Sequence, residues 1–263
     1  GLTEFSPLTP KNQNCMGGRL SPDGSKLVYA CNDPETGGSI YLSDSDGGNA
    51  KIEKRRTFSR YFSWRKDSSA YAYSGSRIVN RFNLYSDVYL RTLSKGTQML
   101  TRGKRARDPV FNPEGTQLLV VTNELQNNQL ATLTVDQTLK THTKNTDHTQ
   151  YSHPRYSPDG SRIAVSVWHK GQRDIWLYSA QGEPLRRITH DKAIDIHPSW
   201  STDGQTLYFS SDRTGIHNIY AIDLETEHIY RTTNVLSGAF SPSPSPDGTH
   251  LVFTYYHNNG FGI

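Results

Sequence analysis

The stretch His153–Gly160 reads HPRYSPDG, and His197–Gly204, which begins 44 residues later, reads HPSWSTDG. The same turn phrase occurs six times in the 263 residues, three times as SPDG and otherwise as RKDS, NPEG and STDG. Each copy contributes one acidic residue: Asp23, Asp67, Glu114, Asp159, Asp203 and Asp247. Because the spacing between these residues stays between 44 and 47, the chain consists of six units of one internal repeat.

One unit contains the residues for four short strands. In the fifth unit the extended run HPSWS is followed by the turn TDG, the alternating run QTLYFSS, the polar loop DRTGIHN, the run IYAIDL, the turn ETEH and the run IYRTT. Asp tolerates the conformation of a tight turn and Gly accepts a positive φ, so the turn phrase joins the first two strands. Four strands in about 44 residues are typical of a β-propeller blade. The sequence therefore predicts an all-β, six-bladed β-propeller of four-stranded antiparallel blades.

The two ends of the chain are predicted to share the sixth blade. The last unit starts near Ser241 and has room for only the beginning of a third strand, while the opening TEFSPLTP resembles the fourth-strand runs PLRRITH and GTQMLTR. We therefore expect a single domain over residues 1–263, in which blade 6 combines residues 1–10 with residues 239–263 and the N-terminal strand closes the ring. The stop at Ile263 leaves open whether the chain is a domain excised from a larger protein or ends there naturally.

Composition argues against several classes of protein. Hydrophobic residues make up 33% of the chain and its mean hydropathy is −0.70. The most apolar windows, such as Gln117–Val121 and Leu251–Tyr256, are only as long as a strand, so no direct membrane insertion is expected. The net charge of +4 favours acidic partners but is too small to indicate nucleic acid. The motifs G-x-S-x-G and H-E-x-x-H and the P-loop phrase are absent, so an enzyme is less favoured and no cofactor is predicted.

The chain has two cysteines, Cys15 and Cys31, which are too few for a metal site of their own. Folding the hairpin about the turn at Asp23 sets them roughly opposite each other on neighbouring strands of blade 1. A disulfide formed in an oxidising compartment and two reduced, buried thiols are both compatible with this arrangement.

The repeat resembles a known family. The phrase P-x-aromatic-S-P-D-G, followed by LVY or LYF and then by NIYAIDL or by SIYLSD with SDGG, is similar to the TolB-type, WD-repeat-like propeller unit over essentially the whole chain. The resemblance is specific for the fold and weakly specific for function. It implies a bacterial protein exported to the periplasm or cell surface, with protein binding at the funnel of the propeller. Nothing here matches the N-terminal α/β domain of TolB, so the resemblance does not extend to TolB's own partners.

The residue aligned with the histidine of HPRYS and HPSWS, which stands before a proline in four of the six units, is predicted to open the first strand of its blade, at the rim of the central channel. The six aligned positions are Gly17, Tyr61, Asp108, His153, His197 and Ser241. The loops between second and third strands and the linkers between blades should open on the same face. We expect a concave binding site there. Its candidate residues are Tyr61, Arg107, Asp108, His153, His169, His197, His217, Ser241 and His257.

Several of these residues have a second interpretation. His153, His197 and Asp108 come from neighbouring blades and resemble a two-histidine, one-carboxylate cation site, although a rim histidine is more often a hydrogen-bonded or partner-contacting group. The charged run Arg102–Arg107 is either a solvated loop or an anion site. The acidic residues of the turn phrase are expected to form turns rather than acid–base pairs. The aromatic residues just before the turn phrase are expected to pack between blades: Trp64, Phe111, Tyr156 and Trp200.

Three functions are compatible with this pattern. The favoured one is a non-catalytic protein–protein interaction module, which binds a peptide or protein segment at the funnel face of the channel, with an acidic partner favoured by the basic rim. The alternative is a metal-dependent polysaccharide-active enzyme resembling oligogalacturonate lyase, although the ligands of such a metal cannot be matched residue by residue here. The third is a structural spacer within a larger surface protein. Metal content distinguishes the first two.

Overall fold

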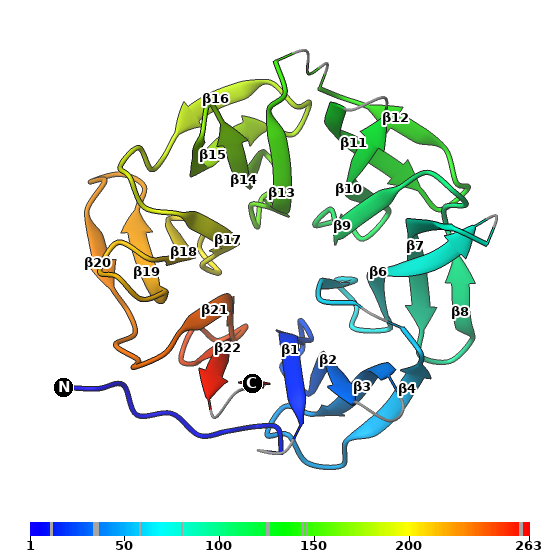
Figure 1. The fold of residues 1–263 in the computed structure, drawn as a ribbon, viewed down its shortest axis with the longest axis horizontal. Coiled ribbons are helices and arrows are strands. Elements are labelled where there is room, and N and C mark those ends of the chain that lie inside the picture. Colours follow the sequence, from blue (N-terminus) through cyan, green and yellow to red (C-terminus); the bar gives the residue numbers. More distant parts are fainter. Residues whose placement is uncertain are drawn as a thin grey trace.

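The computed structural model describes the chain except for residues 11–12, 34–36, 58, 80, 125–126, 144, 146 and 258–259. Six antiparallel sheets lie around a central axis like the blades of a propeller (Figure 1). None of the described residues forms a helix long and apolar enough to cross a membrane. The predicted all-β, six-bladed propeller is confirmed.

Each blade runs outward from an inner strand that faces the channel (Figure 1). Blades 1 to 3 contain β1 (Asn14–Leu20), β2 (Lys26–Asp33), β3 (Gly37–Asp44) and β4 (Lys51–Arg55); β5 (Phe62–Trp64), β6 (Ala70–Val79), β7 (Asn83–Thr92) and β8 (Gly96–Met99); and β9 (Ala106–Phe111), β10 (Gln117–Glu124), β11 (Asn127–Thr134) and β12 (Leu139–Thr141). Blades 4 to 6 contain β13 (Gln150–Tyr156), β14 (Arg162–His169), β15 (Gln172–Ser179) and β16 (Pro184–Arg187); β17 (Asp195–Trp200), β18 (Thr206–Ser211), β19 (Asn218–Asp223) and β20 (Ile229–Arg231); and β21 (Ala239–Pro244), β22 (Leu251–His257) and β23 (Gly260–Gly262). Among the described residues the sixth sheet thus has three strands, and the other five have four each.

The N-terminal segment closes the ring on the outer side of blade 6, as predicted. Figure 1 shows it crossing from the periphery of blade 6 to β1. The backbone N–H of Leu8 donates to the carbonyl of Ile263 at 2.7 Å, and the N–H of Ile263 donates to Thr9 Oγ1 at 3.0 Å. In blade 4, the main chain of Ile175 makes the same two bonds with the Ile-Thr pair that follows β16. The N-terminal segment therefore holds the place of a fourth strand, although it lacks regular strand pairing.

The described apolar core is divided into six clusters, each lying between two neighbouring blades. Between blades 1 and 2, Val28 and Ile40 pack against Phe62 and Trp64. The ring is completed between blades 6 and 1, where Ile263 joins the buried residues around Tyr29. Each such buried side chain contributes about 1.5–3 kcal/mol of transfer free energy.

The aromatic residues before the turn phrases pack between blades, as predicted. The indole Nε1 of Trp64 donates to the carbonyl of Arg19 at 3.0 Å, and that of Trp200 donates to the carbonyl of Arg155 at 3.0 Å. Each bond joins a blade to the preceding one. Phe111 is buried in the cluster between blades 2 and 3.

Cys15 and Cys31 are direct cross-strand partners on β1 and β2, and a disulfide joins them. Both residues are buried beside Tyr29 and Ile263. Of the two arrangements that the sequence allowed, the structure has the disulfide.

Candidate binding site in the central channel

A β-bulge recurs in the inner strand of five blades. The pairing with the second strand shifts register across the residue aligned with His153, for example between Ser152 and Arg155 in blade 4. In four of these blades that residue precedes a proline, and in blade 1 it is Gly17, which precedes Gly18. That residue has a positive φ in each case: Gly17 (75°), Asp108 (53°), His153 (56°), His197 (56°) and Ser241 (52°). A bulge inserts one extra residue, bends the strand and redirects side chains. It also leaves the proline outside the ladder, where its missing N–H costs nothing.

The bulge corrects one detail of the sequence prediction. The residue before the proline does not open the inner strand, because β13 begins at Gln150, three residues before His153, and β17 begins at Asp195, two residues before His197. In blade 2, by contrast, Tyr61 does directly precede β5. Since a bulged strand can pass through an X-Pro pair, these side chains lie partway along the channel and not at its outer rim.

Three aromatic rings meet across the channel. The hydroxyl of Tyr61 is hydrogen-bonded to His153 Nε2 at 2.8 Å, and the ring centroids of His153 and His197 lie 4.2 Å apart. The ring of Tyr61 also lies 6.4 Å from that of His197. These residues belong to blades 2, 4 and 5, so the cluster connects blades that are not all neighbours and narrows the channel at this depth.

Asp108 links blade 3 to blade 4. Its side chain is 1% exposed, and Oδ2 accepts hydrogen bonds from Arg107 Nη1 at 2.7 Å and from the backbone N–H of His153 at 3.0 Å. Arg107 Nη2 in turn donates to the carbonyl of Tyr151 at 2.9 Å. The carboxylate therefore positions the bulge that carries His153.

Three arginines of the channel were not among the predicted residues. Arg19 Nη1 donates to the carbonyl of Pro242 at 2.5 Å, and Arg155 Nη1 donates to the carbonyl of Pro154 at 2.9 Å. Arg173 Nη1 donates to a serine hydroxyl of β13 at 2.8 Å. The sequence held a signal for the first two, since each stands two residues after the bulge residue of its strand.

The charges in the channel determine the protonation of its rings. Burial lowers the pKa of His153 well below its usual value, and the positive charges of arginines on blades 1, 3 and 4 lower it further. Burial also lowers the pKa of His197, and the neighbouring His153 lowers it further. Burial raises the pKa of Tyr61 to about 12. At neutral pH the two imidazoles are therefore neutral and the phenol is protonated, while the arginines supply positive charge.

The arginines also repel one another. Burial lowers the pKa of Arg19, and the charge of Arg155 lowers it further. Burial lowers the pKa of Arg155 to about 10, against the opposing effect of Asp108. An anionic group bound between these arginines would relieve this repulsion.

The proposed cation site of His153, His197 and Asp108 is not favoured. No three histidine, cysteine, aspartate or glutamate side chains in the described part of the chain form a group that could hold a metal ion. Asp108 Oδ2 is already bonded to Arg107 and to a backbone N–H. The surrounding arginines, which lower the pKa of both histidines, also disfavour a cation.

The other predicted site residues lie at different distances from this cluster. The ring of Phe240, next to the bulge residue Ser241, is 4.9 Å from His217 and 6.5 Å from His197, so it connects these two histidines. His169 Nδ1 is instead bonded to a threonine hydroxyl at 2.9 Å and lies 3.5 Å from an aspartate carboxylate. His257 is exposed at the end of β22. The structure therefore brings His217 to the channel cluster, but not His169 or His257.

The basic run before β9 divides into two parts. Arg102, Lys104 and Arg105 are exposed, and the guanidinium of Arg105 lies 4.6 Å from the ring centroid of Tyr85. Arg107 is half-buried and reaches the channel carboxylate. Most of the run is therefore a solvated loop.

Comparisons with known proteins agree with this architecture. Residues 137–263 match the family model of the TolB beta propeller domain. A stretch of 41 residues is 51% identical to the Tol-Pal system protein TolB of Anaeromyxobacter dehalogenans, and it spans 16% of this chain and only 9% of that relative.

Two solved structures show the shared fold. The crystal structure of TolB from Acinetobacter baumannii has a TM-score of 0.75 at 22% identity, over 89% of this chain and 59% of that chain. An oligogalacturonate lyase in complex with manganese has a TM-score of 0.62 at 14% identity, over 97% of this chain and 90% of that chain. At these identities neither likeness extends beyond the fold.

Proposed function

We propose that this TolB-like six-bladed β-propeller is a non-catalytic protein-interaction module, which binds an acidic peptide or protein segment at the funnel face of its central channel. The TolB relative is named for the Tol-Pal system, which supports a role in a protein assembly. The funnel face is the side of the ring on which the inner strands begin and the second strands end. In blade 4, for example, Tyr151 near the start of β13 pairs with Val167 near the end of β14.

The positive charge of the channel is the observation that carries the proposal. Arg19, Arg107, Arg155 and Arg173 act together on one buried imidazole, that of His153. Their guanidinium groups are held by backbone carbonyls or neutral hydroxyls in addition to one carboxylate. Guanidinium groups recognise carboxylates through charge-assisted hydrogen bonds. Aspartate or glutamate side chains of a partner are therefore the ligand chemistry that fits.

A catalytic role has less support. The fold shared with an oligogalacturonate lyase is distant at 14% identity, and the histidines that would hold its metal are surrounded by arginines. Acid–base catalysis uses pairs of titratable groups whose environments shift their pKa values in opposite directions. The channel instead combines neutral rings with buried arginines, which suits recognition of a ligand better than catalysis.

Export to the periplasm or the cell surface is part of the proposal. The disulfide between Cys15 and Cys31 supports it, because disulfides form and persist in oxidising compartments. The match to a TolB relative, although it covers 16% of this chain, points the same way.

Binding of a fluorescein-labelled tetra-aspartate peptide, measured by fluorescence anisotropy at low salt, tests the function. Arg155→Gln should weaken binding about tenfold or more, which is about 1.4 kcal/mol, and added salt should weaken it in the unmodified protein. Arg105→Gln removes an exposed arginine outside the channel and is the matched control. Equal affinity of the two variants, or equal binding of a tetra-lysine peptide, would contradict the proposal.

A further inference from the structure

The longest hairpin among the described strands belongs to blade 2 and projects on the funnel face. β6 pairs with β7 over ten residues, from Ala70 opposite Thr92 to Val79 opposite Asn83. In blade 4, β14 also begins three residues after the acidic residue of its turn phrase, but it pairs with β15 over only eight residues. At about 3.3 Å per residue, the blade 2 hairpin reaches about 7 Å further. The proposed function does not use this projection.

The free end of this hairpin is apolar. Ile78 and Leu84 form a cross-strand pair and are 67% and 69% exposed, and Phe82, which stands in the turn beyond them, is 90% exposed. The hairpin of blade 4 ends instead on the polar pair His169 and Gln172. Single exposed apolar residues are common on protein surfaces, but three large ones on one projecting end mark an interaction surface.

Positive charge surrounds the hairpin just below its apolar end. On the side of blade 3, the guanidinium of Arg105 lies 4.6 Å from the ring centroid of Tyr85, and its Nη2 donates to the Tyr85 hydroxyl at 3.3 Å. A Cβ on Gly103 would lie 3.7 Å from the same ring, so the loop before β9 packs against β7. On the side of blade 1, a Cβ on Gly75 of β6 would lie 3.5 Å from Thr57. Together with a turn residue of the hairpin itself, these segments supply the exposed cations that we call the basic belt: Arg56, Arg81, Arg102, Lys104 and Arg105.

The hairpin supplies no exposed carboxylate to neutralise this charge. Asp87 is the single acidic residue between Ala70 and Thr92, and its side chain is fully buried against Arg77 and Thr101. The exposed charge of the hairpin and the basic belt is therefore positive, which favours an anionic partner.

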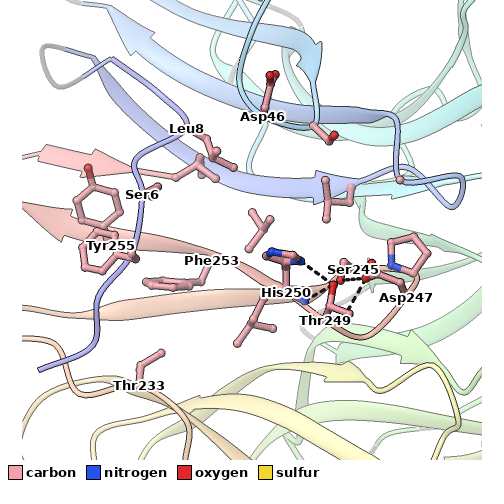
Figure 2. Close-up of a pocket in the computed structure, with 18 of the residues that line it drawn as sticks. Ser6, Leu8, Asp46, Thr233, Ser245, Asp247, Thr249, His250, Phe253 and Tyr255 are labelled. Atoms are coloured by element: carbon pink, nitrogen blue, oxygen red, sulfur yellow. Dashed lines mark hydrogen bonds between the residues drawn. The ribbon is translucent and has the colours of Figure 1, made fainter. Parts of the chain in front are cut away.

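The opposite end of the blades carries negative charge. The acidic residues of the six turn phrases are all exposed, and they stand where the second strands begin. Figure 2 shows the turn of blade 6, in which Ser245 Oγ donates to Asp247 Oδ1 at 2.5 Å and the N–H of Thr249 donates to the same oxygen at 3.1 Å. An anionic surface would therefore attract the end with the hairpin and repel the end with the turns.

The side chains change character along the hairpin from its free end. The apolar end comes first, the pair Arg77 and Tyr85 with Arg105 beside it comes next, and the small polar pair Ser76 and Ser86 follows. A membrane interface has the same order, from acyl chains through headgroups, where tyrosine and arginine are favoured, to water. A protein partner requires no such order, so a lipid surface fits the hairpin better.

We propose that this hairpin docks the protein on an anionic lipid surface. Ile78, Phe82 and Leu84 would enter the boundary between headgroups and acyl chains, and the basic belt would lie at the level of the phosphates. Arg81, which stands next to Phe82, would bend its long side chain back to the phosphates. The contact is peripheral and needs no apolar run longer than a strand, unlike a membrane-spanning segment.

Flotation with unilamellar vesicles tests the proposal. The unmodified protein should bind vesicles of equal parts phosphatidylcholine and phosphatidylglycerol at least about tenfold more tightly than vesicles of phosphatidylcholine alone, about 1.4 kcal/mol, because only the former offer a negative surface. Added salt should weaken binding to the anionic vesicles.

Two substitutions of Phe82 test the apolar end. Phe82→Ser should weaken binding to the anionic vesicles about tenfold or more, whereas Leu185→Ser, which removes a leucine that is 55% exposed on the outer strand of blade 4, should leave it unchanged. Phe82→Cys can be labelled specifically with a nitrobenzoxadiazole fluorophore, because the two native cysteines form a disulfide. The emission of this label should rise on anionic vesicles, and that of a label on Leu185→Cys should not.

The basic belt is tested by removing two of its charges. The double variant Arg102→Gln/Lys104→Gln should weaken binding to the anionic vesicles and reduce its dependence on salt. The matched control is Lys66→Gln/Lys95→Gln, which removes two exposed lysines from the opposite end of the same blade and should bind normally.

Three results would overturn the proposal. The first is binding to the anionic vesicles that is absent or no stronger than binding to phosphatidylcholine alone, which would leave the apolar end to a protein partner. The second is equal binding by Phe82→Ser and the unmodified protein. The third is a dimer, seen by light scattering without lipid, that Phe82→Ser abolishes, which would assign the hairpin to a second copy of this chain. Binding of tetra-aspartate is measured without vesicles and should be unchanged in Phe82→Ser, so the channel and the hairpin are tested separately.

Discussion

The channel and the face that carries the turn phrases are built from the same repeat but differ in charge. In the channel, the bulged strands direct His153, His197, Arg19 and Arg155 inward, and Tyr61 joins them from blade 2. On the face of the turn phrases, hydrogen bonds lower the pKa values of Asp23 and Asp247 to about 2, so both carboxylates stay charged over a wide pH range. The difference shows that two positions of the repeat carry opposite charge. Residues just after the bulge supply the positive charge of the channel, and the turn phrases supply negative charge at the opposite end of the inner strands.

The largest expected effect compares two glycines of positive φ, Gly17 in the channel and Gly24 in the turn between β1 and β2. A Cβ on Gly17 would lie 2.2 Å from the carbonyl oxygen of Arg60, whereas the nearest atom to a Cβ on Gly24 is 3.9 Å away. Gly17→Ala should lower the free energy of unfolding by about 4 kcal/mol, and Gly24→Ala by about 1 kcal/mol from backbone strain alone. Urea denaturation measures both. Similar losses would mean that the channel backbone is not closely packed.

The disulfide lies at the junction of blades 1 and 6. It joins residues separated by 16 positions, and a loop of this length is worth about 3 kcal/mol in the chain-entropy model. The double variant Cys15→Ala/Cys31→Ala should therefore lose about 3 kcal/mol, as measured by urea denaturation. An unchanged urea midpoint after reduction of the disulfide would show that closure of the ring stabilises this junction without it.

A smaller difference in stability is expected between a buried, ion-paired carboxylate and an exposed one. Asp108→Asn removes the buried charge that bonds Arg107 and the N–H of His153, and should cost about 2 kcal/mol because it weakens a buried pair. Asp46→Asn changes an exposed residue in the turn between β3 and β4 and should cost less than about 0.5 kcal/mol. Thermal unfolding of the two variants side by side gives the comparison. A reversed order would refute the positioning role of Asp108.

The last contrast is in the pH dependence of stability. Because burial lowers the folded-state pKa of His153 and His197, the unfolded state binds protons first as the pH falls below the usual histidine range, so stability should decline from about pH 7 to pH 5. The turn carboxylates Asp23 and Asp247, with pKa values lowered to about 2, should lose their contribution to stability only below about pH 4.

The double variant His153→Gln/His197→Gln should flatten the upper part of the profile and leave the acid limb unchanged. His190→Gln, at an exposed position, should change neither limb. Urea denaturation at a series of pH values measures the profile. A decline between pH 7 and pH 5 that survives in the double variant would assign it to other groups.

The repeat made the fold predictable because its signals are local. A turn phrase with Asp and Gly every 44 to 47 residues specifies a hairpin wherever it stands, and six hairpins in register leave few other architectures. The alignment of the six units also predicted that Tyr61, His153 and His197 line the channel, and the structure brings their rings together. The loops between second and third strands were predicted to add His169 and His257, which lie away from this cluster because their positions depend on loop geometry that no local pattern encodes.

What the sequence by itself determined is therefore the number of blades, the closure by the N-terminal segment and the identity of the rings at the centre. Only the tertiary structure decided that the inner strands carry bulges and that Arg19 and Arg155 turn into the channel. The physical reason is that turns and strand alternation depend on residues close in the chain. Channel electrostatics and strand pairing depend instead on contacts such as the bond between Leu8 and Ile263, which join residues at opposite ends of the chain.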